Sequence, residues 1–498
     1  MADLPNEERE LLGFLDRVDG EVKAFRQSTG FDRDAELWLS TRNGRMRLPG
    51  EAEPIFSANL LGSFIDRKVA LLTQSKPDLR VSSRNPTLSP MAHVLTDTAK
   101  AVLDGLQLDA RLEIAADLAA TFGFVGFLTA WDPSAGEIVL KTLDPRLFFV
   151  DHHVKDPADI QRAQYIRIDT PMSLDDVKRT WERGADVKAG ADSQTGPGWG
   201  PWPVMNWITQ SGRRILRPFN QAGGPYDWVN VSEYWLRSGQ ADAQGNLLFP
   251  AGRVVHRVGR VILDDMPNPY WDGLWPVDVW DWRANGDSLL GRSDVEEGRK
   301  IQEAINRIGN SITRNIILSA VFTVVGDYNA MTNEDWKKLD NRAARVLRKQ
   351  PGRELTFVPP PPIPDQYLNF VTQLSGLLEG LIGVPPTMQG RRQAGVIASS
   401  AIEGLMTQAE TPIRAVARRL EYVIERIGAK LVSRIIQFYD GDRVLIINGE
   451  DNDVQQYVFK RAELLGTYLD EAKTDEEREE KLKELHSHFV FKVIPLSS

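Results

Sequence analysis

The run Asp151-His152-His153, with Asp156 close behind it, is the part of the sequence that most resembles a metal site. Imidazole nitrogens and carboxylate oxygens are good ligands for zinc and related ions. Neighbouring residues of a strand, however, point to opposite faces of a sheet. If this run continues a strand, its two histidines chelate poorly together. The chain also has no cysteine, so we predict no metal and no cofactor.

The common nucleotide-binding and nucleophile motifs are missing. The sequence contains neither Gly-x-x-x-x-Gly-Lys-Ser/Thr nor Gly-x-Ser-x-Gly, and a self-contained ATP-driven motor needs the first of these. The adjacent carboxylates Asp264 and Asp265 leave a metal-dependent nuclease as a rival hypothesis, which predicts nuclease activity with divalent cations. We predict that the chain is not an enzyme.

Tryptophan is concentrated in one region, because nine of the 13 tryptophans lie between Trp199 and Trp282. An aromatic platform that binds sugars or single-stranded bases is one interpretation, and it makes an adhesion or carbohydrate-binding module the alternative function. Burial in the core or at subunit contacts is the other interpretation, since tryptophan buries a large apolar area. The first predicts tryptophan fluorescence that responds to a ligand.

Residues 384–398 contain two glycines and two prolines and show no apolar period, which predicts a loop. Four residues at its centre, Gln389, Arg391, Arg392 and Gln393, can donate hydrogen bonds to phosphates without reading base sequence. The loop is therefore a candidate DNA contact. An exposed loop, or a salt bridge between subunits, accounts for the same residues.

A second group of cations stands out because the chain as a whole has a formal net charge of −9. Such a balance argues against a protein that coats DNA electrostatically, but it suits a channel wall along which DNA slides. The group is a candidate partner surface, although an ordinary solvated helix face would look similar. Its members are Lys337, Lys338, Arg342, Arg345, Arg348, Lys349 and Arg353.

Three helices must position both basic groups. The first begins near Ser293, where Glu296 completes a capping-box spacing, and apolar residues then recur every three or four positions. The second begins at Pro364 and ends at Gly383, and the third begins at Ser399 or Ser400. Pro412 should kink the third helix. Residues 319–362, between the first two helices, read as strand, basic helix and strand.

The rest of the chain divides by its periodicity. Residues 1–122 predict helices at 7–26, 56–74 and 90–122, and residues 123–283 predict short strands around a long, mobile loop at 183–226. Within this part, Arg253 to Leu263 reads as one strand. Residues 441–498 predict a strand, a helix from Val454 to Leu469 and a last strand from Phe489 to Ile494. No apolar stretch is long enough to span a membrane.

This order of elements resembles the portal protein, or head–tail connector, of tailed double-stranded DNA bacteriophages, over roughly residues 50 to 495. Several short motifs carry the resemblance: Asn268-Pro269-Tyr270 with Pro276, Gly291 to Asn306 including Gln302, Gly383-Val384-Pro385-Pro386, and Gly390-Arg391-Arg392. The resemblance implies an α+β, mainly helical fold. Its implied parts are a helical wing (1–122), a β-rich wing lobe (123–283), a first stem helix (284–318), a clip (319–362), a second stem helix (363–383), a tunnel loop (384–398), a long kinked helix (399–440) and a reduced crown (441–498).

The resemblance also implies a function. Portal proteins form rings, commonly dodecamers, at one capsid vertex, and viral DNA passes through the ring during packaging and ejection. The implied partners are the terminase large subunit, a head–tail adaptor, and the major capsid and scaffolding proteins, with no membrane. The implied location is the virion, and the host cytoplasm during assembly. In the tunnel loop Arg391 and Arg392 would face DNA, and the basic group from Lys337 to Arg353 would lie on the clip.

Overall fold

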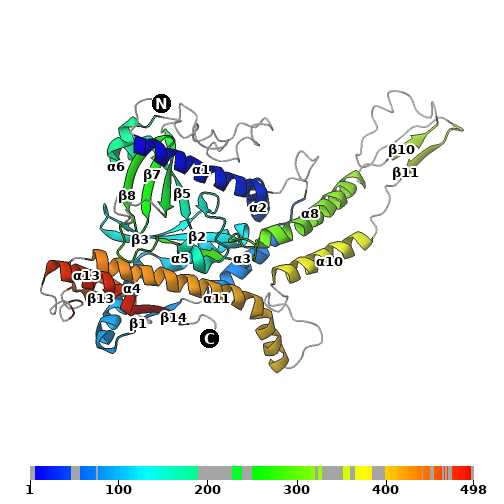
Figure 1. Ribbon diagram of the computed structural model, residues 1–498. Coiled ribbons are helices and arrows are strands. Elements are labelled where there is room, and N and C mark those ends of the chain that lie inside the picture. Colours follow the sequence, from blue (N-terminus) through cyan, green and yellow to red (C-terminus); the bar gives the residue numbers. More distant parts are fainter. Residues whose placement is uncertain are drawn as a thin grey trace.

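The computed structural model contains a mixed α+β body from which one pair of helices projects (Figure 1). The two helices run side by side, and a β-hairpin lies at their far end. The structure describes residues 6–45, 56–74, 77–188, 227–237, 249–319, 323–327, 351–358, 365–383, 399–439, 441–448, 454–461, 465, 468 and 474–494.

The N-terminal part is helical, as predicted. Its elements are α1 (Asn6–Thr29), α2 (Phe31–Arg42), α3 (Leu60–Leu72), α4 (Ser89–Gly105) and α5 (Leu108–Phe122), with β1 (Asp78–Ser83) and the short 3-10 helix η1 (Pro86–Leu88) between α3 and α4. The helix predicted from residue 56 begins at Leu60, because the Asn59 side chain caps it by accepting from the Gly62 N–H. Helix α2 was not predicted from the sequence.

Two antiparallel sheets follow. One has the order β3-β2-β9 and the other β4-β5-β6-β7-β8. Their strands are β2 (Phe124–Asp132), β3 (Glu137–Leu143), β4 (Phe148–Val150), β5 (Tyr165–Ser173), β6 (Trp228–Leu236), β7 (Arg253–Val258), β8 (Val261–Pro267) and β9 (Val277–Asp281), with η2 (Pro157–Arg162), α6 (Leu174–Thr180) and η3 (Glu182–Asp186) in the connections.

Helix α1 covers the five-stranded sheet. Its apolar stripe, including Leu15 and Val18, packs with Tyr234 and Val255 in one buried cluster. A buried carboxylate, Asp19, adds polar contacts: it accepts a hydrogen bond from the Tyr234 hydroxyl at 2.8 Å and forms ion pairs with two arginines of the sheet. These contacts attach α1 to the sheet by both apolar and ionic interactions.

The projecting pair consists of α8 (Asp294–Ser319) and α10 (Asp365–Ile382), and the hairpin at its end pairs β10 (Thr323–Gly326) with β11 (Leu355–Val358). With 26 residues, α8 is about 39 Å long. The third helix, α11 (Ser399–Phe438), runs along the body and contacts β2, β9 and α4 (Figure 1). Figure 1 shows a bend in its N-terminal part, and Pro412 lies inside the helix, as the sequence predicts.

The C-terminal part contains β12 (Arg443–Asn448), β13 (Val454–Phe459), α13 (Asp475–Leu485), the 3-10 helix η6 (His486–His488) and β14 (Phe489–Ile494). The last strand, β14, pairs antiparallel with β1, so residues 489–494 lie beside residues 78–83. The terminal strand predicted from Phe489 is confirmed.

Three sequence predictions are wrong. Residues Val454 to Phe459 form a strand and not a helix, because Phe459 is buried and Val458 exposed, and the segment pairs with β12. The single strand predicted from Arg253 is a hairpin, which turns at Gly259 with a φ of 58°. The loop predicted from residue 183 begins later, since η3 and the buried Val187 pack on α6. Residues 189–226 lie outside the described part.

Candidate subunit interface

Helix α10 has a wide apolar face, only part of which is buried, and this is unusual for a helix that projects from the body. One stripe, Leu374, Leu378 and Ile382, is buried, and the helix packs against α8 and α3. A second set lies open, with exposed fractions from 38% to 62%: Tyr367, Leu368, Phe370, Leu377 and Leu381. Ile316 and Ile317 of α8 are also exposed. Exposed apolar side chains that lie together commonly mark a protein–protein contact, so this surface is a candidate interface.

A buried charge cluster fixes the base of the helix pair. The Lys68 ammonium of α3 donates to the Asp294 carboxylate at 2.8 Å and to the Ile382 carbonyl at 3.1 Å, so it contacts the start of α8 and the end of α10. Arg283 forms ion pairs with Asp294 and Glu297. Burial lowers the pKa of Lys68, and the Asp294 charge partly offsets this. The cluster joins both projecting helices to the body.

Three amides one turn apart on α8 bind the backbone of the segment before α3. The amide oxygens of Gln302, Asn306 and Asn310 accept from the N–H groups of Leu61, Ala58 and Phe56 at 2.9, 3.1 and 2.9 Å. The Asn310 amide nitrogen also donates to the Phe56 carbonyl at 2.9 Å. This arrangement satisfies backbone groups that secondary structure leaves unpaired. Gln302 and Asn306 belong to the motif singled out above, and this is their structural role.

The start of α8 depends on a close backbone contact. The Ser293 hydroxyl accepts from the N–H groups of Val295 and Glu296, as the predicted cap requires, and it also donates to a carbonyl at the end of α5. Next to it Gly123 and Gly291 approach so closely that a Cβ on Gly291 would lie 2.2 Å from the Gly123 carbonyl oxygen. Only glycine allows this approach.

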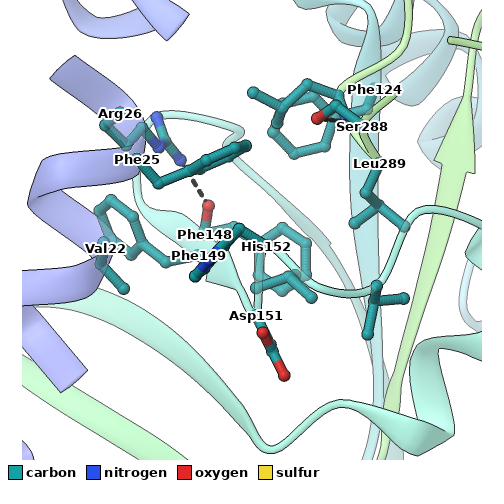
Figure 2. Close-up of a pocket in the computed structure, with 13 residues that line it drawn as sticks. Val22, Phe25, Arg26, Phe124, Phe148, Phe149, Asp151, His152, Ser288 and Leu289 are labelled. Atoms are coloured by element: carbon teal, nitrogen blue, oxygen red, sulfur yellow. Dashed lines mark hydrogen bonds between the residues drawn. The ribbon is translucent and has the colours of Figure 1, made fainter. Parts of the chain in front are cut away.

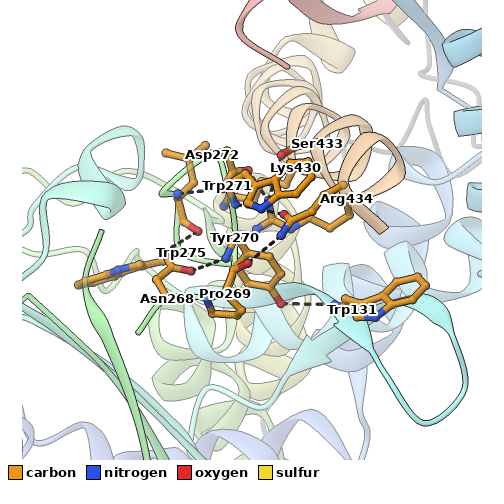
Figure 3. A network of polar contacts seen from close by, with 12 residues as sticks. Trp131, Asn268, Pro269, Tyr270, Trp271, Asp272, Trp275, Lys430, Ser433 and Arg434 are labelled. Carbon is orange, nitrogen blue, oxygen red and sulfur yellow. Dashed lines mark hydrogen bonds and ion pairs between the residues drawn. The ribbon is translucent and has the colours of Figure 1, made fainter. Parts of the chain in front are cut away.

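The Asn268-Pro269-Tyr270 motif forms a corner against α11 (Figure 3). The guanidinium of Arg434 lies over the Tyr270 ring at 3.6 Å and forms an ion pair with Asp272; the side chains of both charged residues are at most 1% exposed. Gln437 donates to the Pro269 carbonyl at 2.8 Å. The corner therefore packs on α11 through a cation–π contact, an ion pair and a hydrogen bond.

One turn earlier, Lys430 of α11 binds the edge of the three-stranded sheet. Its ammonium lies 2.7 Å from the Asp278 carboxylate and donates to the Val277 carbonyl at 2.7 Å. Burial lowers the pKa of Lys430, while the Asp278 charge acts against this. The contacts of Lys430 and Arg434 were not predicted from the sequence. The sequence does carry a signal for them, because both cations fall among the apolar positions of a helix face that is otherwise buried. Such a position indicates a buried cation that needs a partner.

The candidate site residues of the sequence analysis fall largely outside the described part of the chain. These are the loop residues Gln389, Arg391, Arg392 and Gln393, and six cations of the basic group from Lys337 to Lys349. Arg353, the seventh cation, is described, and it is exposed just before β11. Their roles remain predictions.

The rival interpretations find little support among the described residues. Trp235, Trp275, Trp280 and Trp282 are buried in the core, as the structural interpretation of the tryptophans predicts. Asp265 pairs with Arg253, and Asp264 accepts from the Asp265 N–H, so this carboxylate pair forms no open site. Within the described ranges, the group of residues able to hold a metal is Asp151, His152 and His153.

A body with a projecting helix pair that exposes apolar side chains has the form expected of one subunit in a larger assembly. The chain belongs to the phage P22-like portal protein family, because the sequence model of that family matches residues 41–497. Helix α1 and nearly all of α2 precede the matched residues.

One solved structure, described as the virion of a native gene transfer agent (GTA) particle, contains a chain similar to this one. The alignment covers 90% of this chain and 93% of that chain, with 9% sequence identity and a TM-score of 0.42. No curated protein matches the sequence.

Family membership gives the chain a role at the portal of a phage head, in an oligomeric ring of the virion. The predicted α+β portal fold is confirmed. None of the described helices carries an uncharged apolar run of the length that a bilayer span needs.

Proposed function

We propose that this protein is the ring-forming portal at one capsid vertex, and that double-stranded viral DNA passes through the ring during packaging and ejection. The observation that carries the proposal is the exposed apolar surface of α10, on a helix pair that projects from the body. In a closed ring, each copy would bury this surface against a neighbour. Family membership supports the same assembly.

The parts of such a ring can be proposed from the fold. Helices α8 and α10 act as the stem, and residues 319–362 act as the clip that docks the terminase large subunit and later the head–tail adaptor. Residues 384–398 act as the tunnel loop. The body with both sheets acts as the wing, which would contact major capsid and scaffolding proteins. A dodecamer is the ring size that we propose, with assembly in the host cytoplasm.

The first test is the native mass of the purified chain together with negative-stain electron microscopy. We expect closed rings with a central hole and a mass near twelve chains. Copurification of the rings with terminase would support the docking proposal. Stable monomers under every assembly condition would contradict the ring itself.

Charge introduced on the exposed surface of α10 should prevent ring formation. We expect the double variant Leu368→Glu and Leu377→Glu to stay monomeric, because each glutamate would have to be buried without a partner at the interface. Both side chains are more than half exposed in the single chain, so the thermal stability of the monomer should change by less than a few degrees. Native mass spectrometry and thermal unfolding measure the two properties.

Ile114→Glu is the matched control, because Ile114 on α5 is 58% exposed and belongs to neither helix of the projecting pair. It should leave rings intact. Normal rings from the double variant on α10 would show that this surface does not form the interface.

The tunnel-loop proposal has its own test. We expect Arg391→Ala with Arg392→Ala to form normal rings but to lower the amount of packaged DNA severalfold, because phosphate contacts would be lost. The measurement is the DNA content of particles assembled with each variant. Lysine at both positions should retain packaging, since the positive charges remain. Full packaging by the alanine variant would exclude a DNA-contact role for these arginines.

A further inference from the structure

A turn after β4 brings two histidines and a carboxylate together. Strand β4 ends at Val150, and His152 and His153 lie in the turn that follows. Their ring centroids are 4.0 Å apart, and one ligand atom from each of Asp151, His152 and His153 lies within 4.8 Å of the others. The sequence-based expectation of opposite faces assumed a strand here. That assumption does not hold, since the turn gathers the three side chains.

Asp151 supplies a buried negative charge. Its side chain is 2% exposed, and its carboxylate accepts from the N–H groups of His153 and Gln164 at 3.0 and 2.9 Å. Burial acts to raise the pKa of Asp151, but these hydrogen bonds outweigh it and hold the pKa below its ordinary value. Among the described residues no lysine or arginine pairs with this carboxylate, and its other partner is the His153 ring at 2.8 Å.

The two imidazoles are held differently. The His152 ring stacks on Phe25 of α1 at 5.5 Å and lines a cavity with Val22 and Arg26 (Figure 2). Its Nδ1 is buried and has no hydrogen-bond partner within the described part of the structure. The His153 side chain is 75% exposed, while its Nδ1 contacts Asp151. One ring is thus oriented by packing on Phe25 and the other by its contact with the Asp151 carboxylate.

We propose that Asp151, His152 and His153 bind one divalent transition-metal ion, Zn²⁺ or Co²⁺ by ligand type. Two imidazole nitrogens and a carboxylate are ligands that these ions prefer, and three protein ligands leave a coordination position open. The ion enters from the exposed His153 side. Behind His152, the Arg26 guanidinium is occupied by the carbonyls of Pro145 and Phe148 and by Asp32. Through His152 and Phe25, the bound ion braces the end of β4 against α1.

The test uses tag-free full-length protein, stripped of metal by a chelator. Visible absorption during a Co²⁺ titration, and calorimetry with Zn²⁺, report the binding. We expect one saturable site per chain with the absorption bands of cobalt bound to nitrogen ligands. His152→Ala and His153→Ala should each weaken binding at least tenfold. His153→Ala changes an exposed side chain, so it should fold normally.

His93→Ala is the matched control, since His93 is an exposed histidine of α4, and it should bind as the unaltered protein does. No saturable binding by the unaltered protein would overturn the proposal. Unchanged binding in His152→Ala and His153→Ala, or an equal loss in His93→Ala, would overturn it as well. None of these results bears on ring formation, which is tested separately.

Discussion

Replacement of Arg434 by methionine should destabilise the protein by about 3–5 kcal/mol, the usual range for breaking a buried ion pair. Methionine fills a similar volume but leaves the Asp272 charge in the interior, where the Asp272 side chain is 1% exposed. The substitution also removes the cation from the Tyr270 ring. Urea unfolding, followed by tryptophan fluorescence, measures the loss of stability.

A second variant distinguishes the effect of leaving the Asp272 charge without a partner from the effect of lost packing. Adding Asp272→Asn to Arg434→Met removes the charge and keeps the oxygen that accepts from the Leu274 N–H. We expect the double variant to recover more than half of the lost stability. The exposed Arg418→Met on the same helix should cost less than about 0.5 kcal/mol. A loss below about 1 kcal/mol in Arg434→Met would mean that the pair contributes little.

Gly123→Ala should destabilise the protein nearly as much as Arg434→Met. We expect the free energy of unfolding to fall by about 3 kcal/mol or more, from backbone strain and overpacking together. Gly123 has a φ of 90°, which alanine adopts only with strain, and an added Cβ would lie 2.1 Å from the Gly291 carbonyl oxygen. The backbone at the start of α8 would have to move. Thermal unfolding and the yield of soluble protein measure the effect.

Gly136→Ala provides the matched comparison. Gly136 has a φ of 65°, but no atom lies within 4 Å of an added Cβ. The strain is therefore similar and the clash is absent, so the loss should be about 1–2 kcal/mol. Equal losses at the two positions would show that backbone strain alone explains Gly123→Ala, and that the contact with Gly291 is not tight.

Much of the helical framework can be predicted from local sequence. The Ser293 cap and the apolar period of α8 predict that helix because both signals act within a few residues. Gly383, with a φ of 79°, likewise marks the end of α10. Helix α2 was missed although Phe31, Ala35 and Trp38 are buried at helical spacing.

Errors arose where distant partners decide the local structure. Residues Val454 to Phe459 form a strand because β12 lies beside them, and no pattern within the segment itself indicates that pairing. The turn at Gly259 follows from the pairing of β7 with β8. The Asp151–His153 cluster is a similar case. The prediction that its histidines chelate poorly assumed a strand, but the strand ends at Val150.

Only the buried part of α10 could be predicted from the sequence, and the exposed part that forms the candidate interface could not. Apolar spacing identifies the stripe of α10 that faces α8, and Leu374 and Leu378 are buried as expected. The sequence also contains the apolar residues that flank this stripe, but their exposure depends on how far the helix pair projects from the body. The polar contacts at Lys68, Lys430 and Arg434 join segments that are 150 to more than 200 residues apart, a separation that no local pattern encodes.

The pairing of β1 with β14 has a consequence for synthesis. Residues 78–83 leave the ribosome long before residues 489–494 exist, so their strand edge must wait unpaired while the rest of the chain is made. Closing this sheet has the entropic cost of closing a very long loop, so it comes late in folding. A truncated or stalled chain would expose that edge, which is a template for misassociation. Strand β14 thus acts as a checkpoint, because a chain that stops before residue 489 cannot close this sheet.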